Sequence, residues 1–203
     1  MTVERPLRVA AVVLAAGRSL RMGGANKLLV PVAGVPLIAR VVGEICASRA
    51  APVIVVTGHE EAHVRAALAG FAVFFAHNPD YAAGLSTSLA TGLAALPADI
   101  DGAVVCLGDM PRVTAAVIDR LIAAFAPDDG RAICLPVYRG KRGNPVLWAR
   151  RFFAEMEGLI GDVGARHLID EHGDALCEVE TEDDGVLIDI DTPGALAALA
   201  EPR

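Results

Sequence analysis

The segment from Leu14 to Lys27 combines glycines and cations in a way that suits a phosphate chain. Glycines let the backbone approach phosphate oxygens and point N–H groups at them, and basic side chains add positive charge. The segment contains Gly17, Gly23, Gly24, Arg18, Arg21 and Lys27. It is not a P-loop, because no Gly-Lys-Ser/Thr closes it, and it lacks the GxGxxG spacing of dinucleotide sites. A solvated turn would also explain the composition, but its place directly after the first apolar run favours phosphate binding.

A carboxylate follows a second apolar run. Asp109 comes after the stretch Ala103–Leu107, between Gly108 and Pro111. Mg²⁺ typically takes one or two carboxylates together with phosphate oxygens, so Asp109 is a candidate metal ligand. An Asx-type turn explains an aspartate beside glycine and proline equally well when this stretch is taken alone.

Two further carboxylates, Asp189 and Asp191, stand near the end of the chain. Alternation along a strand places both on the same side, and Asp191 is then a candidate second ligand for the metal that Asp109 would hold. The next residues, Thr192 and Pro193, also have the pattern of a helix start, so plain helix capping explains them as well.

The stretch from Gly84 to Leu89 is rich in small hydroxyl residues, among them Ser86 and Ser88. Hydroxyl groups at a junction between a loop and a helix can bond a ribose or a base. They can also cap the helix, and we expect one of them to do so.

The stretch His59-Glu-Glu-Ala-His63 matches the H-E-x-x-H pattern of zinc peptidases. That pattern requires both histidines within one helix. Here His59 follows Gly58 and the predicted strand Val53–Thr57 directly, so it precedes the helix, and no third ligand is evident. We expect a chance match.

Alternation of apolar and amphipathic runs predicts the elements that position these residues. The predicted strands are Arg8–Ala15, Val53–Thr57, Ala72–Ala76, Gly102–Leu107, Ala132–Val137, Asn144–Trp148, Cys177–Glu180 and Val186–Asp189. The predicted helices are Leu37–Ala47, Glu60–Leu68, Ser86–Leu96, Ala115–Phe125, Arg150–Glu155, Val163–Glu171 and Pro193–Ala200. This order predicts an α/β fold with a mostly parallel sheet between two layers of helices, and antiparallel strands between Tyr138 and Gly185. Ligands of such sheets bind beyond the carboxyl ends of the strands, where the candidate residues lie.

The bulk properties agree with a globular enzyme. The 203 residues fit one domain, residues 1–203, and the net charge of −7 argues against a broad nucleic-acid-binding face. Val9–Ala16 is too short an apolar run to span a bilayer, and a signal-peptide layout is absent. The four cysteines are widely spaced, which favours reduced thiols. We therefore expect a cytoplasmic protein that binds neither nucleic acid nor membrane.

Taken together and in order, these motifs resemble those of the molybdenum-cofactor nucleotidyltransferases, the MobA-like NTP transferases. Leu14–Lys27 is similar to the family's LAAGxSxRMG…K signature, Gly108–Pro111 to its metal motif and Asp189–Pro193 to its DxDTP element. Arg142–Pro145 and Gly161–Arg166 resemble segments that the family places around the acceptor. The resemblance covers nearly the whole chain and implies a three-layer, Rossmann-like nucleotide-diphospho-sugar transferase fold.

The resemblance implies transfer of a nucleotide from an NTP to molybdopterin cofactor, with release of pyrophosphate. Lys27, Arg21 and Asp109 would be catalytic, and Mg²⁺ would be the cofactor, bound by Asp109 and Asp191. Asn144 and Arg166 would bind the acceptor. The implied nucleotide-binding residues are Leu14, Ala15, Ala16, Gly17, Ser19, Gly23, Gly58, Gly84, Ser86 and Ser88. A molybdoenzyme or its chaperone is a further expected partner.

The base is predicted from Ala16. The sequence Ala15-Ala16-Gly17 resembles the cytidylyl branch, whereas the guanylyl branch tends to have glycine at position 16, so we expect CTP, with GTP as the second candidate. The spacing up to Lys27 is one residue longer than the commonest cytidylyl spacing.

The residues are compatible with two further functions. The same fold could transfer a nucleotide to a different phosphorylated acceptor, such as a sugar phosphate. The chain could also be a nucleotide-binding chaperone without enzyme activity, but the paired carboxylates disfavour this, since a pure binder has less need of a metal at the α-phosphate.

Overall fold

The computed structural model describes residues 5–20, 26–161, 164–192 and 194–195. Its strands are β1 (Val9–Ala15), β2 (Pro31–Val32), β3 (Val35–Pro36), β4 (Val53–Thr57), β5 (Phe74–His77), β6 (Gly102–Leu107), β7 (Ile133–Tyr138), β8 (Lys141–Arg142), β9 (Val146–Ala149) and β10 (Leu176–Glu180). Its α-helices are α1 (Leu37–Ala47), α2 (Glu61–Ala67), α3 (Leu85–Ala94), α4 (Ala115–Ala124), α5 (Phe153–Glu157) and α6 (Arg166–Glu171). Short 3-10 turns cover Lys27–Leu29, Tyr81–Ala83, Pro127–Asp129, Arg150–Phe152, Gly173–Ala175 and Asp184–Leu187.

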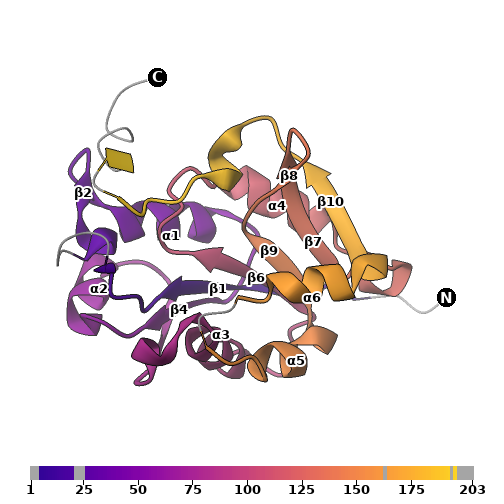
Figure 1. Cartoon of the computed structure of the whole chain (residues 1–203), viewed down its shortest axis with the longest axis horizontal. Coiled ribbons are helices and arrows are strands. Elements are labelled where there is room, and N and C mark those ends of the chain that lie inside the picture. The colour runs from indigo at the N-terminus through magenta and orange to yellow at the C-terminus, as the bar shows by residue number, and fades with distance from the viewer. Residues whose placement is uncertain (1–4, 21–25, 162–163, 193, 196–203) are drawn as a thin grey trace.

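The main sheet has the strand order β10-β7-β9-β6-β1-β4-β5, and β8 pairs with β7. Strands β6, β1, β4 and β5 are parallel to one another, whereas β9 is antiparallel to both β6 and β7. In Figure 1, α1 and α4 lie on one side of the sheet and α3 and α5 on the other. The predicted mostly parallel sheet between two helical layers is therefore confirmed, as are antiparallel strands after Tyr138.

The centre of the sheet is apolar on both faces. All seven residues of β1 are buried, as are all five of β4, because helices cover both sides. On one side, α3 packs directly onto these strands through Gly92. A Cβ there would lie 2.4 Å from Val12 Cγ1 and 2.8 Å from Val56 Cγ2, so only glycine allows this approach. The close packing brings the N-terminal end of α3 to the carboxyl end of β1.

Most predicted elements lie within two residues of those observed, but the predicted strand Val186–Asp189 is wrong. Residues Asp184–Leu187 form a 3-10 turn, because the side chain of Asp183 accepts a hydrogen bond from Gly185 N at 2.7 Å. The predicted helix Arg150–Glu155 begins as a 3-10 turn and becomes α-helical at Phe153. The predicted helix Pro193–Ala200 lies outside the described residues, apart from Gly194 and Ala195.

Within the described part of the chain, the helices are too short or too polar to cross a membrane.

Candidate active site

The loops after β1 and β6 meet at the carboxyl edge of the sheet. Gly108, which follows β6, donates its N–H to Leu14 O at 3.0 Å. A Cβ on Gly108 would lie 3.0 Å from both Leu14 O and Ile38 Cδ1, so glycine permits this close contact. The next residue, Asp109, is thereby held beside the end of β1.

The C-terminal segment is held at the same edge by Ile190. Its N–H donates to Asp109 O at 3.0 Å, and its side chain is buried in a small apolar cluster with Val32 and Leu37. In extended backbone, neighbouring side chains point to opposite sides. Burial of Ile190 therefore directs both Asp189 and Asp191 away from that cluster, towards Asp109.

Lys27 completes the charged group. The 3-10 turn that it begins is capped by Asn26, whose side chain accepts from Leu28 N at 3.1 Å. The N–H of Lys27 donates to Ser19 Oγ at 3.1 Å, which joins the two described ends of the glycine-rich segment. Its ammonium lies 2.6 Å from Asp109 Oδ2 and 2.5 Å from Asp191 Oδ1.

Among the described residues, the charge balance of this group is negative. Oxygens of Asp109, Asp189 and Asp191 all lie within 4.8 Å of one another, and Lys27 brings one positive charge to them. Burial of Lys27 would lower its pKa, but the nearby carboxylates of Asp109 and Asp191 outweigh this effect and raise the pKa, so the side chain stays charged.

The acidic group fits a hard divalent cation. Asp109 Oδ1 is buried and accepts no hydrogen bond from any described residue, which leaves one carboxylate oxygen in need of a partner. Carboxylate oxygens are the ligands that Mg²⁺ and similar cations prefer. The expected ligands Asp109 and Asp191 are brought together here, and Asp189 joins them. Because Asp189 and Asp191 lie two positions apart, the alternation pattern itself was the signal that could have identified Asp189.

A cavity of about 540 Å³, which we name the loop cavity, opens beside this group. Two stretches form much of its wall: the start of the glycine-rich segment, Ala16–Leu20 with Lys27, and the stretch Tyr81–Leu85 with Ser88. Asp109, Asp189 and Asp191 also line it. Tyr81 had no motif to mark it in the sequence.

The structure separates the predicted nucleotide-binding residues into two groups. Those on the wall of the loop cavity are Leu14, Ala16, Gly17, Ser19, Gly84 and Ser88. Ala15, Gly58 and Ser86 do not line it. A Cβ on Gly58 would lie 2.6 Å from Tyr81 Cβ and 2.8 Å from Ala16 Cβ, so Gly58 supports two wall residues without lining the cavity.

Ser86 departs most from expectation. Its side chain is 1% exposed, its hydroxyl has no hydrogen-bond partner among the described residues, and its N–H donates to Gly161 O at 3.2 Å. Position 86 thus faces the segment around Gly161, whereas Ser88, two residues later, lines the cavity. Two other predicted residues, Arg21 and Gly23, lie outside the residues that the structure describes.

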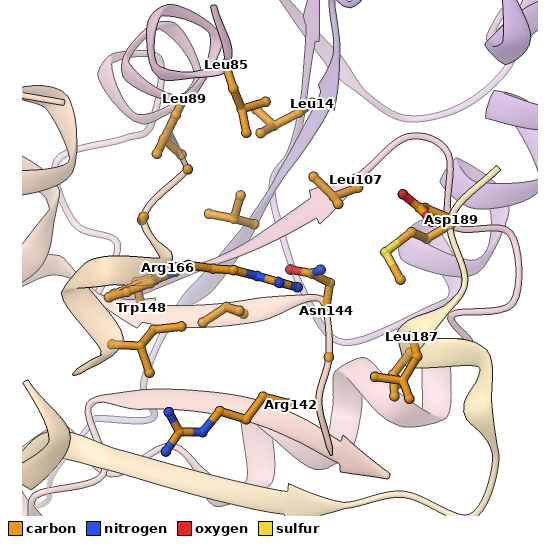
Figure 2. A pocket seen from close by; sticks show the side chains of 18 of the residues that line it. Leu14, Leu85, Leu89, Leu107, Arg142, Asn144, Trp148, Arg166, Leu187 and Asp189 are labelled. Atoms are coloured by element: carbon orange, nitrogen blue, oxygen red, sulfur yellow. The ribbon is translucent and has the colours of Figure 1, made fainter. Parts of the chain in front are cut away.

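A larger cavity of about 910 Å³ adjoins the loop cavity, and the two share Leu14, Leu85, Leu107 and Asp189. We name it the large cavity. Much of its wall is apolar, formed by Leu89, Val105, Met110, Val146, Trp148, Met156 and Ile169. Figure 2 shows Arg166 extending across it towards Asn144, so both predicted acceptor residues line this space. Among the described residues, Arg166 has no ion-pair partner, which leaves its charge available to an anion.

Arg142 has a different role from its neighbours. Its Nε lies 2.7 Å from Glu178 Oε1 and its guanidinium lies 3.1 Å from Asp170 Oδ1, and these carboxylates raise its pKa. In Figure 2 its head group points away from Asn144 and Arg166. Arg142 therefore links β8 to β10 and α6 at the rim of the large cavity.

The H-E-x-x-H stretch does not form a zinc site in the part of the chain that is described. Glu60 adopts a left-handed conformation (φ 51°) and α2 starts only at Glu61, so His59 and His63 do not share one helix. Instead, His59 N donates to Ala16 O at 3.1 Å and supports the wall of the loop cavity from behind.

The chain is similar to known proteins both in sequence and in structure. The bifunctional protein GlmU of Rhizorhabdus wittichii is 34% identical over 162 residues, which cover 79% of this chain and 34% of that protein. The chain spans about a quarter to a third of the length of the curated relatives it matches.

Two solved structures are similar over nearly the whole chain. A nucleotidyl transferase from Methanothermobacter thermautotroptrophicus has a TM-score of 0.83 at 26% identity, over 95% of this chain and 96% of that one. Rv0371C of Mycobacterium tuberculosis H37Rv, in complex with manganese, has a TM-score of 0.81 at 26% identity, over 95% and 98%. The predicted Rossmann-like nucleotidyltransferase fold is confirmed. Residues 11–176 match the MobA-like NTP transferase domain, and the chain therefore belongs to this family of nucleotidyltransferases.

Proposed function

We propose that this protein joins CTP to molybdopterin cofactor and releases pyrophosphate, with residues 1–203 acting as one domain. The observation that carries the proposal is the position of the charged group. Asp109, Asp191 and Lys27 line the loop cavity, and Asp189 lines both cavities. A nucleotide in the loop cavity and an acceptor in the large cavity would meet at these residues.

The reaction needs positioning and charge neutralisation more than covalent work by the protein. An oxygen of the acceptor's phosphate attacks the α-phosphorus of the triphosphate. A new P–O bond forms between this oxygen and the α-phosphorus. The bond between the α-phosphorus and the oxygen that bridges it to the β-phosphate breaks, and pyrophosphate leaves with the electron pair of the broken bond. The N–H groups near Gly17 and the charges of Arg18 and Lys27 offset the negative charge of the phosphates. Arg166 pairs with the phosphate of the anionic acceptor in the large cavity.

Mg²⁺ is the proposed cofactor, with Asp109 and Asp191 as its protein ligands and Asp189 as a third carboxylate within reach. When bound, it would neutralise charge on the α-phosphate and on the leaving pyrophosphate. The unpartnered Oδ1 of Asp109 supports this assignment, and the manganese complex of Rv0371C supports a divalent metal at a site in this fold.

The large cavity supports an acceptor bigger than a sugar phosphate. Its volume of about 910 Å³ lies near the top of the range for drug-sized ligands, about 300–1,000 Å³. Its wall combines the apolar side chains of Trp148, Met110 and Met156 with Arg166 and Asn144. Such a lining suits an acceptor whose ring system packs against the apolar side chains, while Asn144 and Arg166 meet its polar groups and its phosphate, as the pterin and the phosphate of molybdopterin would.

The choice of CTP rests on the resemblance of Ala15-Ala16-Gly17 to the cytidylyl branch. Ala16 lines the loop cavity and is 3% exposed, and its methyl group packs beside Gly58. A base that packs against this wall would therefore contact Ala16. The packing of Ala16 against Gly58 fixes how far the cavity extends at this point. GTP is the second candidate, and a competition between nucleotides decides between them.

The test mixes purified protein, Mg²⁺ and molybdopterin cofactor with CTP, GTP or ATP and measures pyrophosphate release. We expect release to be fastest with CTP. Fastest release with GTP would overturn the base assignment. Release with a sugar phosphate but not with molybdopterin would overturn the acceptor, and no release with any combination would overturn the proposal as a whole.

Asp109→Asn is the matching variant. It keeps the side chain's shape but removes its charge, so we expect kcat to fall on the order of 100-fold or more, the scale on which loss of one transition-state contact acts. Asp129→Asn, on the surface beside Arg131, is the control and should keep wild-type rates. A wild-type rate for Asp109→Asn would remove this residue from the mechanism.

A further inference from the structure

Asn78 is a buried amide that joins three segments behind the loop cavity, and no sequence motif marked it. It is 2% exposed and directly follows β5, and its N–H donates to Thr57 O at 2.8 Å. Its side chain bonds Asp80, at the start of the stretch that forms one cavity wall, and Thr87 and Ser88 in the first turns of α3.

The orientation of the Asn78 amide is fixed by a partner that can only donate. Asp80 N lies 2.9 Å from the side-chain oxygen of Asn78, and a backbone N–H offers no lone pair. A flipped amide would set two donors against each other at this position. The amide nitrogen must therefore face α3, where it donates to Thr87 Oγ1 at 2.9 Å and to Ser88 Oγ at 3.0 Å.

The two hydroxyl groups that accept these bonds then differ in what they do with their own hydrogens. Thr87 has backbone acceptors, Gly84 O at 2.9 Å and Asp80 O at 3.1 Å, so its hydrogen stays within the protein. Ser88 donates to no acceptor among the described residues, and it lines the loop cavity while being 5% exposed. A buried hydroxyl hydrogen is stabilised by an acceptor, and here the cavity is the place from which one can come.

We propose that Asn78 is a positioning residue that makes the Ser88 hydroxyl a hydrogen-bond donor towards the bound nucleotide. This inference rests on the proposed function, which places the nucleotide in the loop cavity. The partner is an acceptor atom of the nucleoside, either on the base, such as O2 or N3 of cytosine, or on the ribose. By this bond Asn78 contributes to nucleotide selection without touching the nucleotide.

Asn78→Asp tests the inference because it replaces the amide donor that faces Thr87 and Ser88 by a carboxylate acceptor of nearly the same shape. The carboxylate still accepts from Asp80 N, but it can no longer donate, so Ser88 turns its hydrogen towards the carboxylate and its lone pair towards the cavity. We expect the Kd of CTP with Mg²⁺, measured by calorimetry without acceptor, to rise roughly three- to tenfold, the scale of one hydrogen bond. Ser88→Ala should give the same rise.

A double variant separates this role from a general effect on the fold. If Asn78 acts through Ser88, Asn78→Asp should add little further loss in the Ser88→Ala background. In turnover assays the nucleotide KM should rise while kcat and the acceptor KM stay unchanged. Thr87→Val is the control: it disturbs the same network but leaves Ser88 as a donor, so CTP affinity should stay within about twofold of wild type. Wild-type affinity in either Asn78→Asp or Ser88→Ala would overturn the proposal.

Nucleotide analogues provide a test that does not depend on the folding of the Asn78 variant. 3-Deaza-CTP lacks the N3 acceptor, 2-thio-CTP weakens the O2 acceptor, and 2′-deoxy-CTP lacks a ribose oxygen. We expect one of them to bind the wild-type protein more weakly than CTP but to lose nothing more in Ser88→Ala. Equal losses in both proteins for all three would overturn the proposal. Absence of CTP binding by the wild-type protein would instead count against the proposed function.

Discussion

Lys27 Nζ lies 2.6 Å from Asp109 Oδ2 although 82 positions separate the two residues in the sequence. The same ammonium lies 2.5 Å from Asp191 Oδ1, 164 positions away. One cation thus bridges two carboxylates that come from different loops at the sheet edge. These are also the carboxylates proposed to bind Mg²⁺, so the ammonium and the metal would share them: Lys27 contacts Oδ2 of Asp109, and Oδ1 of the same carboxylate is left for the metal.

This shared use predicts the behaviour of Lys27→Met. Without metal, the variant removes the ammonium that lies between Asp109 and Asp191, and we expect the free energy of unfolding to fall by about 1–3 kcal/mol. Mg²⁺ or Mn²⁺ should then raise the melting temperature of the variant more than that of the wild type, because the metal replaces the missing charge. Thermal unfolding with EDTA and with each metal measures both effects.

Lys141→Met is the control for this measurement, since Lys141 is an exposed residue on β8. Its stability and its response to metal should match the wild type. A Lys27→Met protein that responds to metal as the wild type does would contradict binding of the metal by Asp109 and Asp191.

The sheet could be predicted from the sequence because its central strands are buried on both faces. Val53–Thr57 and Gly102–Leu107 are predicted with the bounds that are observed, since continuous apolar runs between polar turns leave one solution. The strands β2, β3 and β8 were not predicted, because a strand of two residues is too short to show an alternating pattern in the sequence. Val186–Asp189 has the composition of a strand, but the Asp183 turn decides its conformation.

Only those residues of the site that belong to a recognisable sequence motif could be predicted. The rule that ligands bind at the carboxyl ends of the strands accounts for Asp109 after β6 and for the segment after β1, whereas Asp191 reaches Lys27 from a segment that does not follow a strand. Asn78 and Tyr81 were missed because their roles depend on contacts between separate segments. Ser86 and Ser88 have the same chemistry in the sequence, and only the packing of α3 shows that one of them reaches the cavity.

Gly58 gives a second prediction, because its contacts reach the loop cavity indirectly. Gly58→Ala must displace Tyr81 and Ala16, whose Cβ atoms would lie 2.6 Å and 2.8 Å from the new methyl group. We expect a loss of stability of about 1–3 kcal/mol, as for other overpacked sites, together with a higher nucleotide KM. Gly173→Ala has no atom within 4 Å of its new Cβ and is the matched control. Equal stability and kinetics for the two variants would contradict this role of Gly58.

The buried thiols give a third prediction. Burial raises the pKa of Cys106 to about 12, and burial together with the neighbouring Cys177 raises that of Cys134 to about 12. At pH 8 such thiols are thiolates in only about one molecule in 10⁴, and the thiolate is the reactive form. We expect iodoacetamide to leave both unlabelled in the folded protein and to label both in urea, as read by mass spectrometry. Rapid labelling of Cys106 in the folded protein would show that the core opens readily.

The same shifts fix the direction of the pH dependence of stability. Because the folded-state pKa of each thiol lies above the unfolded value of about 8.5, the folded state binds more protons at alkaline pH. The stabilisation is complete below about pH 8 and is lost as the pH rises from about 9 towards 12. The raised pKa of Lys27 acts in the same direction above about pH 10. Urea unfolding at about pH 8 and about pH 10 should therefore give the lower free energy of unfolding at the higher pH, and the opposite order would contradict these shifts.

Arg166 gives a further prediction, which concerns the acceptor. Its side chain crosses the large cavity towards Asn144 and has no ion-pair partner among the described residues, so its charge is available to an anionic acceptor. Arg166→Gln keeps much of the length needed to fill the space but removes the charge. A hydrogen bond to a charged group contributes about 1.5–3 kcal/mol, so we expect the acceptor KM to rise roughly 10- to 100-fold. The nucleotide KM should stay unchanged, because Arg166 does not line the loop cavity. Initial rates of pyrophosphate release with each substrate varied in turn measure the two constants, with Arg151→Gln as the surface control. A rise in the nucleotide KM with an unchanged acceptor KM would show that the nucleotide binds in the large cavity, and would contradict the proposed placement of the two substrates.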